Sequence, residues 1–218
     1  MLDAIRRTLL AASVPFTKRL GKVHSPFSHK EISGMHYMDA KTKLIPGQVL
    51  LTRTEGELTT AFIPGFWTHG AIYAGDGWVI EAIGAGVVKT DLVSFMMTKD
   101  VMAACTPLFA TTEQRQAAVA WAVKQLGDPY DYDFISGNKA FYCFELTYAA
   151  YQEATGKASP WQLRKTLGVD TVIGDDFEKA KDKWLFGWDS RQMKAGRDAG
   201  GIPFLAFTGV TLPEAPVA

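Results

Sequence analysis

The stretch "HGAIYAGDGWVIEA", residues 69–82, decides the fold because it predicts a β-hairpin that begins on a histidine. Its arms, residues 71–73 and 78–80, are rich in β-branched and aromatic side chains, and the Gly-Asp-Gly between them is typical of a tight turn. His69 opens the first arm and Glu81 lies near the end of the second. The functional question is whether these two polar side chains share one face of the hairpin.

The length of the turn decides this question, because side chains alternate between the two faces of a strand. With a two-residue turn of Asp76 and Gly77, Ile72 would lie opposite Glu81. Glu81 would then point to the opposite face from His69, and the two could not act together.

With a three-residue turn over residues 75–77, Ala74 faces Trp78 and Ala71 faces Glu81. The carboxylate and the histidine then share a face as diagonal neighbours, a separation that long side chains bridge. The third position of such a turn needs a left-handed conformation, which a glycine adopts easily. We therefore expect the three-residue turn.

A candidate nucleophile lies downstream, in "YCFELTYAAY", residues 142–151. This segment predicts a helix that begins near Cys143, and the amides at a helix N-terminus stabilise a thiolate. Cys105 lies in the apolar segment "VMAACTPLF" and is expected to be a small buried hydrophobic residue. A thiolate nucleophile also needs a base on a rigid element, and His69 fits this requirement. The other three histidines are expected to be solvated in loops: His24, His29 and His36.

Strand signals precede helix signals along the chain, which favours an α+β fold with an antiparallel sheet, or a partly open barrel, packed against helices. A polar, turn-rich link is expected over residues 22–43, and a short strand over residues 204–207. The expected strands cover residues 48–54, 70–74, 78–83, 86–95 and 101–109, and the expected helices cover residues 112–127, with Thr111 or Thr112 as N-cap, 141–156 and 175–184.

We expect three parts: a basic extension, residues 1–43, a domain that holds the candidate histidine and cysteine, residues 44–190, and a tail, residues 191–218. The chain has 218 residues, of which 47% are hydrophobic, enough for one buried core. Its net charge is zero, so we expect no nucleic-acid partner. Neither a metal nor a cofactor is expected, because the two cysteines lack metal-site spacing and no cofactor motif is visible.

The first 30 residues hold six basic residues and one acidic residue. They predict a short amphipathic helix that ends near Pro15, which either docks on its own domain or contacts a membrane surface. The segment makes a poor signal peptide, since its apolar stretch is short and flanked by basic residues. We therefore expect a cytoplasmic or peripheral membrane location.

The hairpin and the cysteine segment together resemble the circularly permuted, papain-like cysteine amidases related to NlpC-type cell-wall peptidases, which are bacterial hydrolases. In that branch the histidine strand precedes the cysteine helix. The resemblance covers residues 44–188 and implies a papain-like core in permuted order. Supporting segments are "IPGQVLL" at 45–51, "LGDPYDYDF" at 126–134 and "GDDFEKAKDKW" at 174–184.

This resemblance implies that Cys143 is the nucleophile, His69 the general base and then acid, and Glu81 the residue that orients the imidazole. The backbone N–H of Cys143 would contribute to an oxyanion hole. The residues expected to bind substrate are Tyr130, Trp67 and Tyr142.

One departure from the family pattern follows the cysteine, where Phe144 stands in place of a common serine. We expect this change to alter the polarity of the pocket. Glu145, the next residue, is expected to be a charge on the helix surface.

The sequence thus predicts a cysteine hydrolase that cleaves an amide bond, in a peptide, a cell-wall peptide or an N-acyl substrate, through a thioester on Cys143. Two alternatives stay open. The histidine strand is also similar to "H-x-x-x-Y-x-G-D-G" of the lecithin:retinol acyltransferase-like proteins, which implies a lipid acyltransferase or phospholipase. The third possibility is a binding module without activity.

Overall fold

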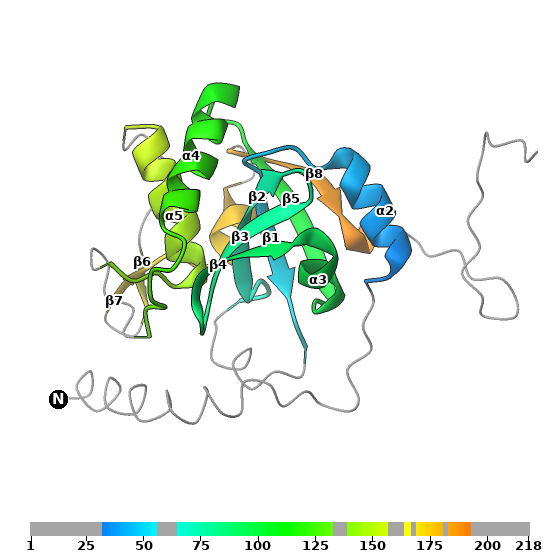
Figure 1. Ribbon diagram of the computed structural model, residues 1–218, viewed down its shortest axis with the longest axis horizontal. Coiled ribbons are helices and arrows are strands. Elements are labelled where there is room, and N and C mark those ends of the chain that lie inside the picture. Colours follow the sequence, from blue (N-terminus) through cyan, green and yellow to red (C-terminus); the bar gives the residue numbers. More distant parts are fainter. Residues whose placement is uncertain are drawn as a thin grey trace, which may run out of the picture.

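The computed structural model describes residues 32–55, 65–132, 139–156, 164–166, 169–180 and 183–192 (Figure 1). Four features predicted from the sequence lie outside the described residues: the N-terminal amphipathic helix, His24, His29 and the strand at 204–207. No helix among the described residues is long and apolar enough to cross a membrane.

Six strands form one open sheet in the order β4-β3-β2-β1-β5-β8, and every neighbouring pair is antiparallel. The predicted α+β class with an antiparallel sheet is therefore confirmed, in its open form. A second sheet pairs the short strands β6 and β7. The strands are β1 (Val49–Arg53), β2 (His69–Gly75), β3 (Trp78–Ile83), β4 (Gly86–Asp91), β5 (Val101–Pro107), β6 (Arg164–Thr166), β7 (Val169–Thr171) and β8 (Trp184–Asp189).

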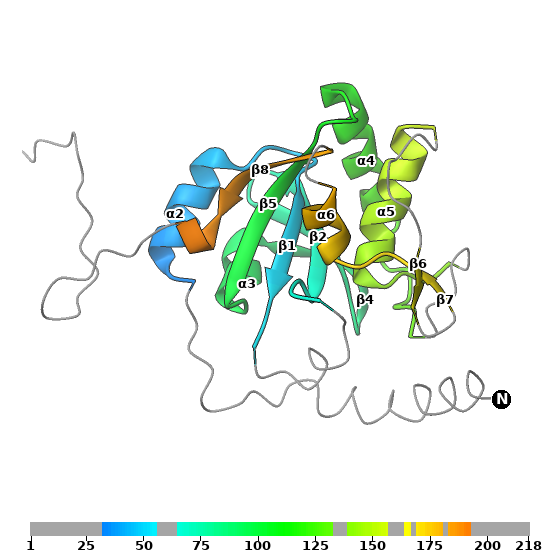
Figure 2. The ribbon, with the colours of Figure 1, turned by 180° about the vertical axis from the view of Figure 1, so that it is seen from behind.

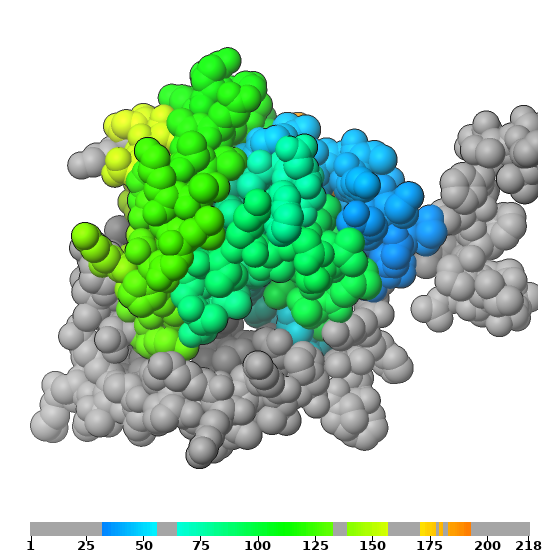
Figure 3. Space-filling view, in the orientation of Figure 1, coloured from blue at the N-terminus to red at the C-terminus, as the bar shows by residue number. Residues whose placement is uncertain are grey.

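Helices cover both faces of the large sheet, as Figures 1 and 2 show from opposite sides. α4 and α5 pack together on one face, and α2 and α3 lie on the other. In Figure 3 the surface on one side runs from α4 across the β3–β4 region and α3 to α2. The helices are α2 (Gly34–Lys43), α3 (Leu92–Met97), α4 (Thr112–Lys124), α5 (Cys143–Ala154), α6 (Asp175–Lys179) and the 3-10 turn η2 (Ser190–Gln192).

The alternation of side chains along the central strands feeds two hydrophobic clusters. In β1, Leu51 joins the cluster beneath α4 and α5, whereas Leu50 joins the cluster beneath α2 and α3. Both side chains are fully buried. A strand covered on both faces needs apolar residues at consecutive positions. This explains why "VLL" in β1 shows no alternation of polarity.

The β2–β3 hairpin has the predicted facing but not the predicted turn. Ala71 pairs with Glu81, as expected. However, Gly75 rather than Ala74 pairs with Trp78. The expectation of a three-residue turn is therefore wrong.

The turn itself consists of two residues, Asp76 and Gly77, whose φ angles are 50° and 77°. Two consecutive left-handed residues are the conformation of the tight hairpin turn that Asp-Gly favours. The extra residue is Ala74, which lies in a bulge between the pairs Tyr73–Val79 and Gly75–Trp78. A bulge shifts the register by one residue, so it restores the facing that a regular two-residue hairpin would lose.

Residues 34–43 form α2, where the sequence predicted a turn-rich link. The N-terminus of α2 is capped by Ser33 and His36, and Nδ1 of His36 accepts a hydrogen bond from the Ser33 backbone N–H at 3.1 Å. His36 is buried rather than solvated in a loop. The signal that sequence analysis overlooked is the pair Ser33 and His36, whose side chains form the capping box of this helix.

Two other predicted elements change type. The strand expected over 86–95 ends at Asp91, whose carboxylate caps α3 by accepting a hydrogen bond from Ser94 N–H at 2.9 Å. The helix expected over 175–184 ends at Lys179, and the edge strand β8 begins at Trp184. In contrast, α4 begins as predicted, because Thr111 and Gln114 cap each other's backbone N–H.

Candidate active site

The candidate nucleophile, Cys143, is the first residue of α5 and its side chain is buried, with 4% of the residue exposed. Hydrogen bonding by His69 and by the backbone of Gly70 and Phe144 lowers the pKa of its thiol. Because β2 begins at His69 and α5 begins at Cys143, the two side chains meet where both elements begin. The structure therefore brings together the two residues on which the sequence argument depended.

Gly70 allows this close approach of helix and strand. A Cβ atom at this position would lie 2.6 Å from Cδ1 of the Phe144 ring, closer than carbon atoms approach without displacement. The ring of Phe144 therefore occupies the space where a side chain of residue 70 would stand. Sequence analysis did not select Gly70, although a glycine inside a strand is a known sign of close packing.

Glu81 holds the imidazole of His69 from the neighbouring strand. Nε2 of His69 lies 2.8 Å from Oε2 of Glu81, and the two side chains are 15% and 6% exposed. The carboxylate is the diagonal neighbour of the histidine across the β2–β3 pair. Since Glu81 engages Nε2, Nδ1 is the ring nitrogen that is left to face Cys143.

Thr90 contacts the other oxygen of the same carboxylate. Its hydroxyl lies 2.6 Å from Oε1 of Glu81 and donates a hydrogen bond to it. Both carboxylate oxygens thus have a partner, as a buried carboxylate requires. Sequence reasoning missed Thr90. Its only signal is its position in the next strand, on the face that Glu81 occupies.

The site favours charge separation between the cysteine and the histidine. Burial alone raises the pKa of the Cys143 thiol, but the hydrogen bond and charge of His69 outweigh burial and lower it. Burial alone lowers the pKa of His69, but hydrogen bonds to Cys143 and Glu81 raise it to about 9. Opposite charges in contact stabilise each other's ionised forms. The lowered pKa of Cys143 and the raised pKa of His69 therefore both favour a thiolate–imidazolium pair.

Cys143, His69 and Glu81 form a row of side chains, and its third member, Glu81, stays ionised. Burial raises the pKa of Glu81, but its hydrogen bond and attraction to His69 lower it to about 2. Lys99 lowers the pKa of Glu81 further and opposes the protonation of His69. A carboxylate that stays negative at neutral pH can hold the imidazolium through the reaction.

Tyr130 lies beside the nucleophile. Burial and the negative charge of Cys143 raise the pKa of its phenol well above the ordinary value. Its backbone forms a single parallel bridge with Phe141, just before α5. Its ring packs edge-to-face on Tyr132, with centroids 4.8 Å apart. This placement agrees with a position in the wall of the site.

Trp67 and Tyr142, the other two residues expected to bind substrate, lie in the interior. Trp67 is fully buried, and its backbone N–H donates to Oδ1 of Asp175 at 3.2 Å. The hydroxyl of Tyr142 accepts a hydrogen bond from Val172 N–H at 2.9 Å. Both side chains are buried in the interior of this structure, and their contact with substrate stays a prediction.

The two residues after the nucleophile differ from expectation. Glu145 is buried, 6% exposed, so the expectation of a surface charge is wrong. Phe144 is 2% exposed, and its ring is enclosed by Gly70 and Gly174. Its ring therefore packs in the interior and does not set the polarity of an open pocket. The Phe144 ring packs against Gly70 of β2, which contacts α5.

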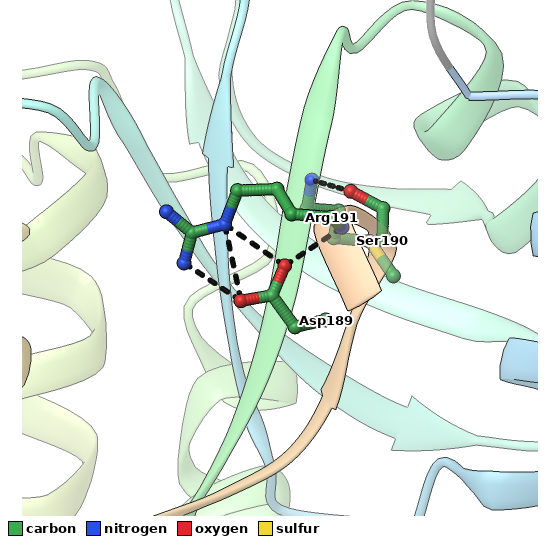
Figure 4. Close-up of polar contacts among 4 residues, drawn as sticks. Asp189, Ser190 and Arg191 are labelled. Carbon is green, nitrogen blue, oxygen red and sulfur yellow. Dashed lines mark hydrogen bonds and ion pairs between the residues drawn. The ribbon is translucent and has the colours of Figure 1, made fainter. Parts of the chain in front are cut away.

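The segment that leads into β2 is held by residues from the end of the described chain. The guanidinium of Arg191 lies 5.1 Å from the ring centroid of Phe66 and 4.9 Å from that of Trp67. Asp189 fixes this guanidinium, with Nη2 and Oδ2 2.6 Å apart (Figure 4). Asp175 accepts from Phe66 N–H at 2.8 Å. Sequence analysis missed this clamp, because it assigned Arg191 to the tail.

η2 is itself fixed to the sheet. The hydroxyl of Ser190 accepts a hydrogen bond from the backbone N–H of Met102 at 3.1 Å, as Figure 4 shows. Within the residues that the structure describes, no group of three or more His, Cys, Asp or Glu side chains is arranged to hold a metal ion.

Comparison of the sequence with known proteins identifies a family. Residues 43–194 match the family model described as permuted papain-like amidase enzyme, YaeF/YiiX, C92 family. A solved structure, the metalloprotein yiiX from Escherichia coli O157:H7, is 22% identical, with a TM-score of 0.47, covering 52% of this chain and 68% of that chain. No curated protein matches. The family match confirms the resemblance to permuted papain-like amidases.

Proposed function

Because the chain belongs to the permuted papain-like amidase family and is thus a cysteine hydrolase, we propose that it cleaves an amide bond through a thioester on Cys143. The observation that carries this proposal is the row in which Glu81 lies 2.8 Å from His69 and His69 lowers the pKa of Cys143. The substrate is a peptide, a cell-wall peptide or an N-acylated small molecule.

The first step is attack of the Cys143 thiolate on the carbonyl carbon. The C–S bond forms, and the carbonyl π electrons move to oxygen. The backbone N–H of Cys143, at the N-terminus of α5, stabilises the resulting oxyanion in this proposal. The lowered pKa of Cys143 favours the thiolate before attack, so this step is written without a separate proton transfer.

In the second step the C–N bond breaks, and Nδ1 of His69 gives its proton to the leaving nitrogen. The product amine departs and the acyl group stays on Cys143 as a thioester. Neutral His69 then takes a proton from water, whose oxygen attacks the thioester. Collapse releases the carboxylic acid and regenerates the thiolate and the imidazolium.

Glu81 keeps the ring oriented while its charge changes. Its hydrogen bond to Nε2 prevents the imidazole from rotating, so that the same nitrogen faces the sulfur in both steps. Its negative charge stabilises the imidazolium before the first step and after the last. These roles need no group other than side chains and backbone of this chain.

Trapping the acyl-enzyme tests the proposal directly. The full chain would be mixed in parallel with cell-wall peptides, N-acyl amino acids and phospholipid vesicles, quenched in acid and measured by intact-protein mass spectrometry. We expect an adduct on Cys143 from an amide substrate. The Cys105→Ala variant, which lacks the buried thiol of β5, is the control and keeps the adduct.

Two outcomes would contradict the proposal. An adduct that forms only from phospholipid would identify a lipid acyltransferase. Absence of any adduct, together with Cys143 labelling by an alkylator no faster than an ordinary thiol, would identify a binding module.

A further inference from the structure

A line of polar side chains crosses three adjacent strands of the sheet and extends beyond the residues used in the mechanism. Glu81 in β3 pairs with Val88 of β4, and Thr90 lies two residues further along that strand. Because side chains two residues apart share a face, Thr90 is the diagonal neighbour of Glu81 on the side opposite His69. The threonine therefore lies at the end of the row that begins at the nucleophile.

We propose that Thr90 is a positioning residue, whose hydroxyl fixes the orientation and the ionised state of Glu81 and, through Glu81, the imidazolium of His69. The contact that supports this role is the 2.6 Å hydrogen bond from the Thr90 hydroxyl to Oε1 of Glu81. The inference rests on the proposed function, since it assigns a role within the same catalytic row.

The physical argument starts from the burial of Glu81, which is 5% exposed. A buried carboxylate is costly unless both oxygens are hydrogen-bonded. His69 serves Oε2 and Thr90 serves Oε1. Without the hydroxyl, the charged form of Glu81 loses a stabilising donor, and its pKa rises. Glu81 then stabilises the imidazolium less, and the thiolate of Cys143 becomes less favoured.

The other groups that act on this row come from different elements and stay in place when Thr90 is changed. Cys143 of α5 acts on His69 from one side. Lys99, in the segment after α3, acts on both His69 and Glu81. A shift that follows substitution of Thr90 therefore reports the loss of one hydrogen bond to Glu81.

The experiment measures how fast iodoacetamide alkylates Cys143 as a function of pH, by peptide mass spectrometry, in the full chain. The variants are Thr90→Val, which keeps the size and β-propensity but removes the hydroxyl, and Thr90→Ser, which keeps the hydroxyl. The matched control is Thr106→Val in β5. This half-buried strand threonine accepts a hydrogen bond from the neutral amide of Gln48 at 2.9 Å.

In the wild-type protein we expect a midpoint below the ordinary thiol value. Thr90→Val should raise this midpoint by about 0.5–1 pH unit, which slows labelling about three- to tenfold at pH values below both midpoints. Thr90→Ser and Thr106→Val should keep the wild-type midpoint.

If the wild-type midpoint is low, two results would overturn the role of Thr90 and leave the proposed function standing. One is an unchanged midpoint in Thr90→Val. The other is a shift in Thr90→Ser as large as that in Thr90→Val. A wild-type midpoint at the ordinary thiol value would contradict the proposed function itself, and the role of Thr90 with it, because Thr90 acts only through the ion pair.

Discussion

Glu81 engages Nε2 of His69 at 2.8 Å, which leaves Nδ1 of the ring for Cys143. The nitrogen that exchanges protons with substrate is thereby determined by a contact on the far side of the ring. It also follows that the pKa of His69 depends on both partners, one on β3 and one on α5.

The pH dependence of activity follows from these pKa shifts. The pKa of Cys143 is lowered, so kcat/KM should reach its plateau below the ordinary thiol range. It should fall again above about pH 9, where His69 loses the proton that the leaving nitrogen needs. A pH profile of kcat/KM checks this. A basic limb near pH 6.5 would contradict the ion pair.

Loss of either partner of the ion pair should abolish turnover. Cys143→Ala removes the nucleophile, and His69→Ala removes the proton donor, so each should lower kcat by at least about three orders of magnitude. Cys105→Ala should keep most of the activity, since Cys105 is buried in β5 and absent from the row. Hydrolysis assays on the three purified variants, with circular dichroism to verify folding, make the comparison.

Gly70→Ala should impair both stability and activity. The added methyl group would lie 2.6 Å from the Phe144 ring, so α5 must move away from β2. Overpacking of this kind costs about 1–3 kcal/mol, and the same movement separates Cys143 from His69.

Urea unfolding and the rate of Cys143 alkylation measure the two effects of Gly70→Ala. The matched control is Gly34→Ala at the start of α2, where a Cβ meets nothing within 4 Å. Equal behaviour of the two variants would show that the close approach at Gly70 is not required.

Lys99→Met should raise the pKa of His69. The positive charge of Lys99 opposes protonation of the imidazole, and methionine removes the charge while keeping an unbranched chain. The basic limb of the pH profile should therefore move to higher pH. The difference in the basic limb between Lys99→Met and the wild-type protein should shrink at high ionic strength, because salt screens the charge of the partly exposed lysine. A movement to lower pH would contradict this electrostatic effect.

Strand parity predicted that His69 and Glu81 share a face, although the turn length expected from the sequence was wrong. Alternation determines which residues share a face once a pairing is chosen, but it does not reveal a bulge at Ala74. Gly77 suited both the expected turn and the observed one, so the glycine could not discriminate between them. The pairing Ala71–Glu81 was confirmed because the bulge takes up the one residue that the expected longer turn would have contained.

Features that depend on long-range packing were not predictable. Trp184 begins an edge strand rather than ending a helix, because β5 offers it backbone partners. The contact of Thr90 with Glu81 depends on the pairing of β4 with β3. The basic extension and the tail stay predictions, as do the substrate-binding roles of Tyr130, Trp67 and Tyr142.

The bulge at Ala74 has a consequence for how the hairpin tolerates changes in length. Removal of this one residue would leave a regular two-residue hairpin in which Ala71 still faces Glu81, because the pairs on both sides of the bulge already match. Deletion of Ala74 can therefore be absorbed at the hairpin tip while the pairing of Ala71 with Glu81 is kept. A natural variant one residue shorter at this position would present the same chemistry from a straighter strand.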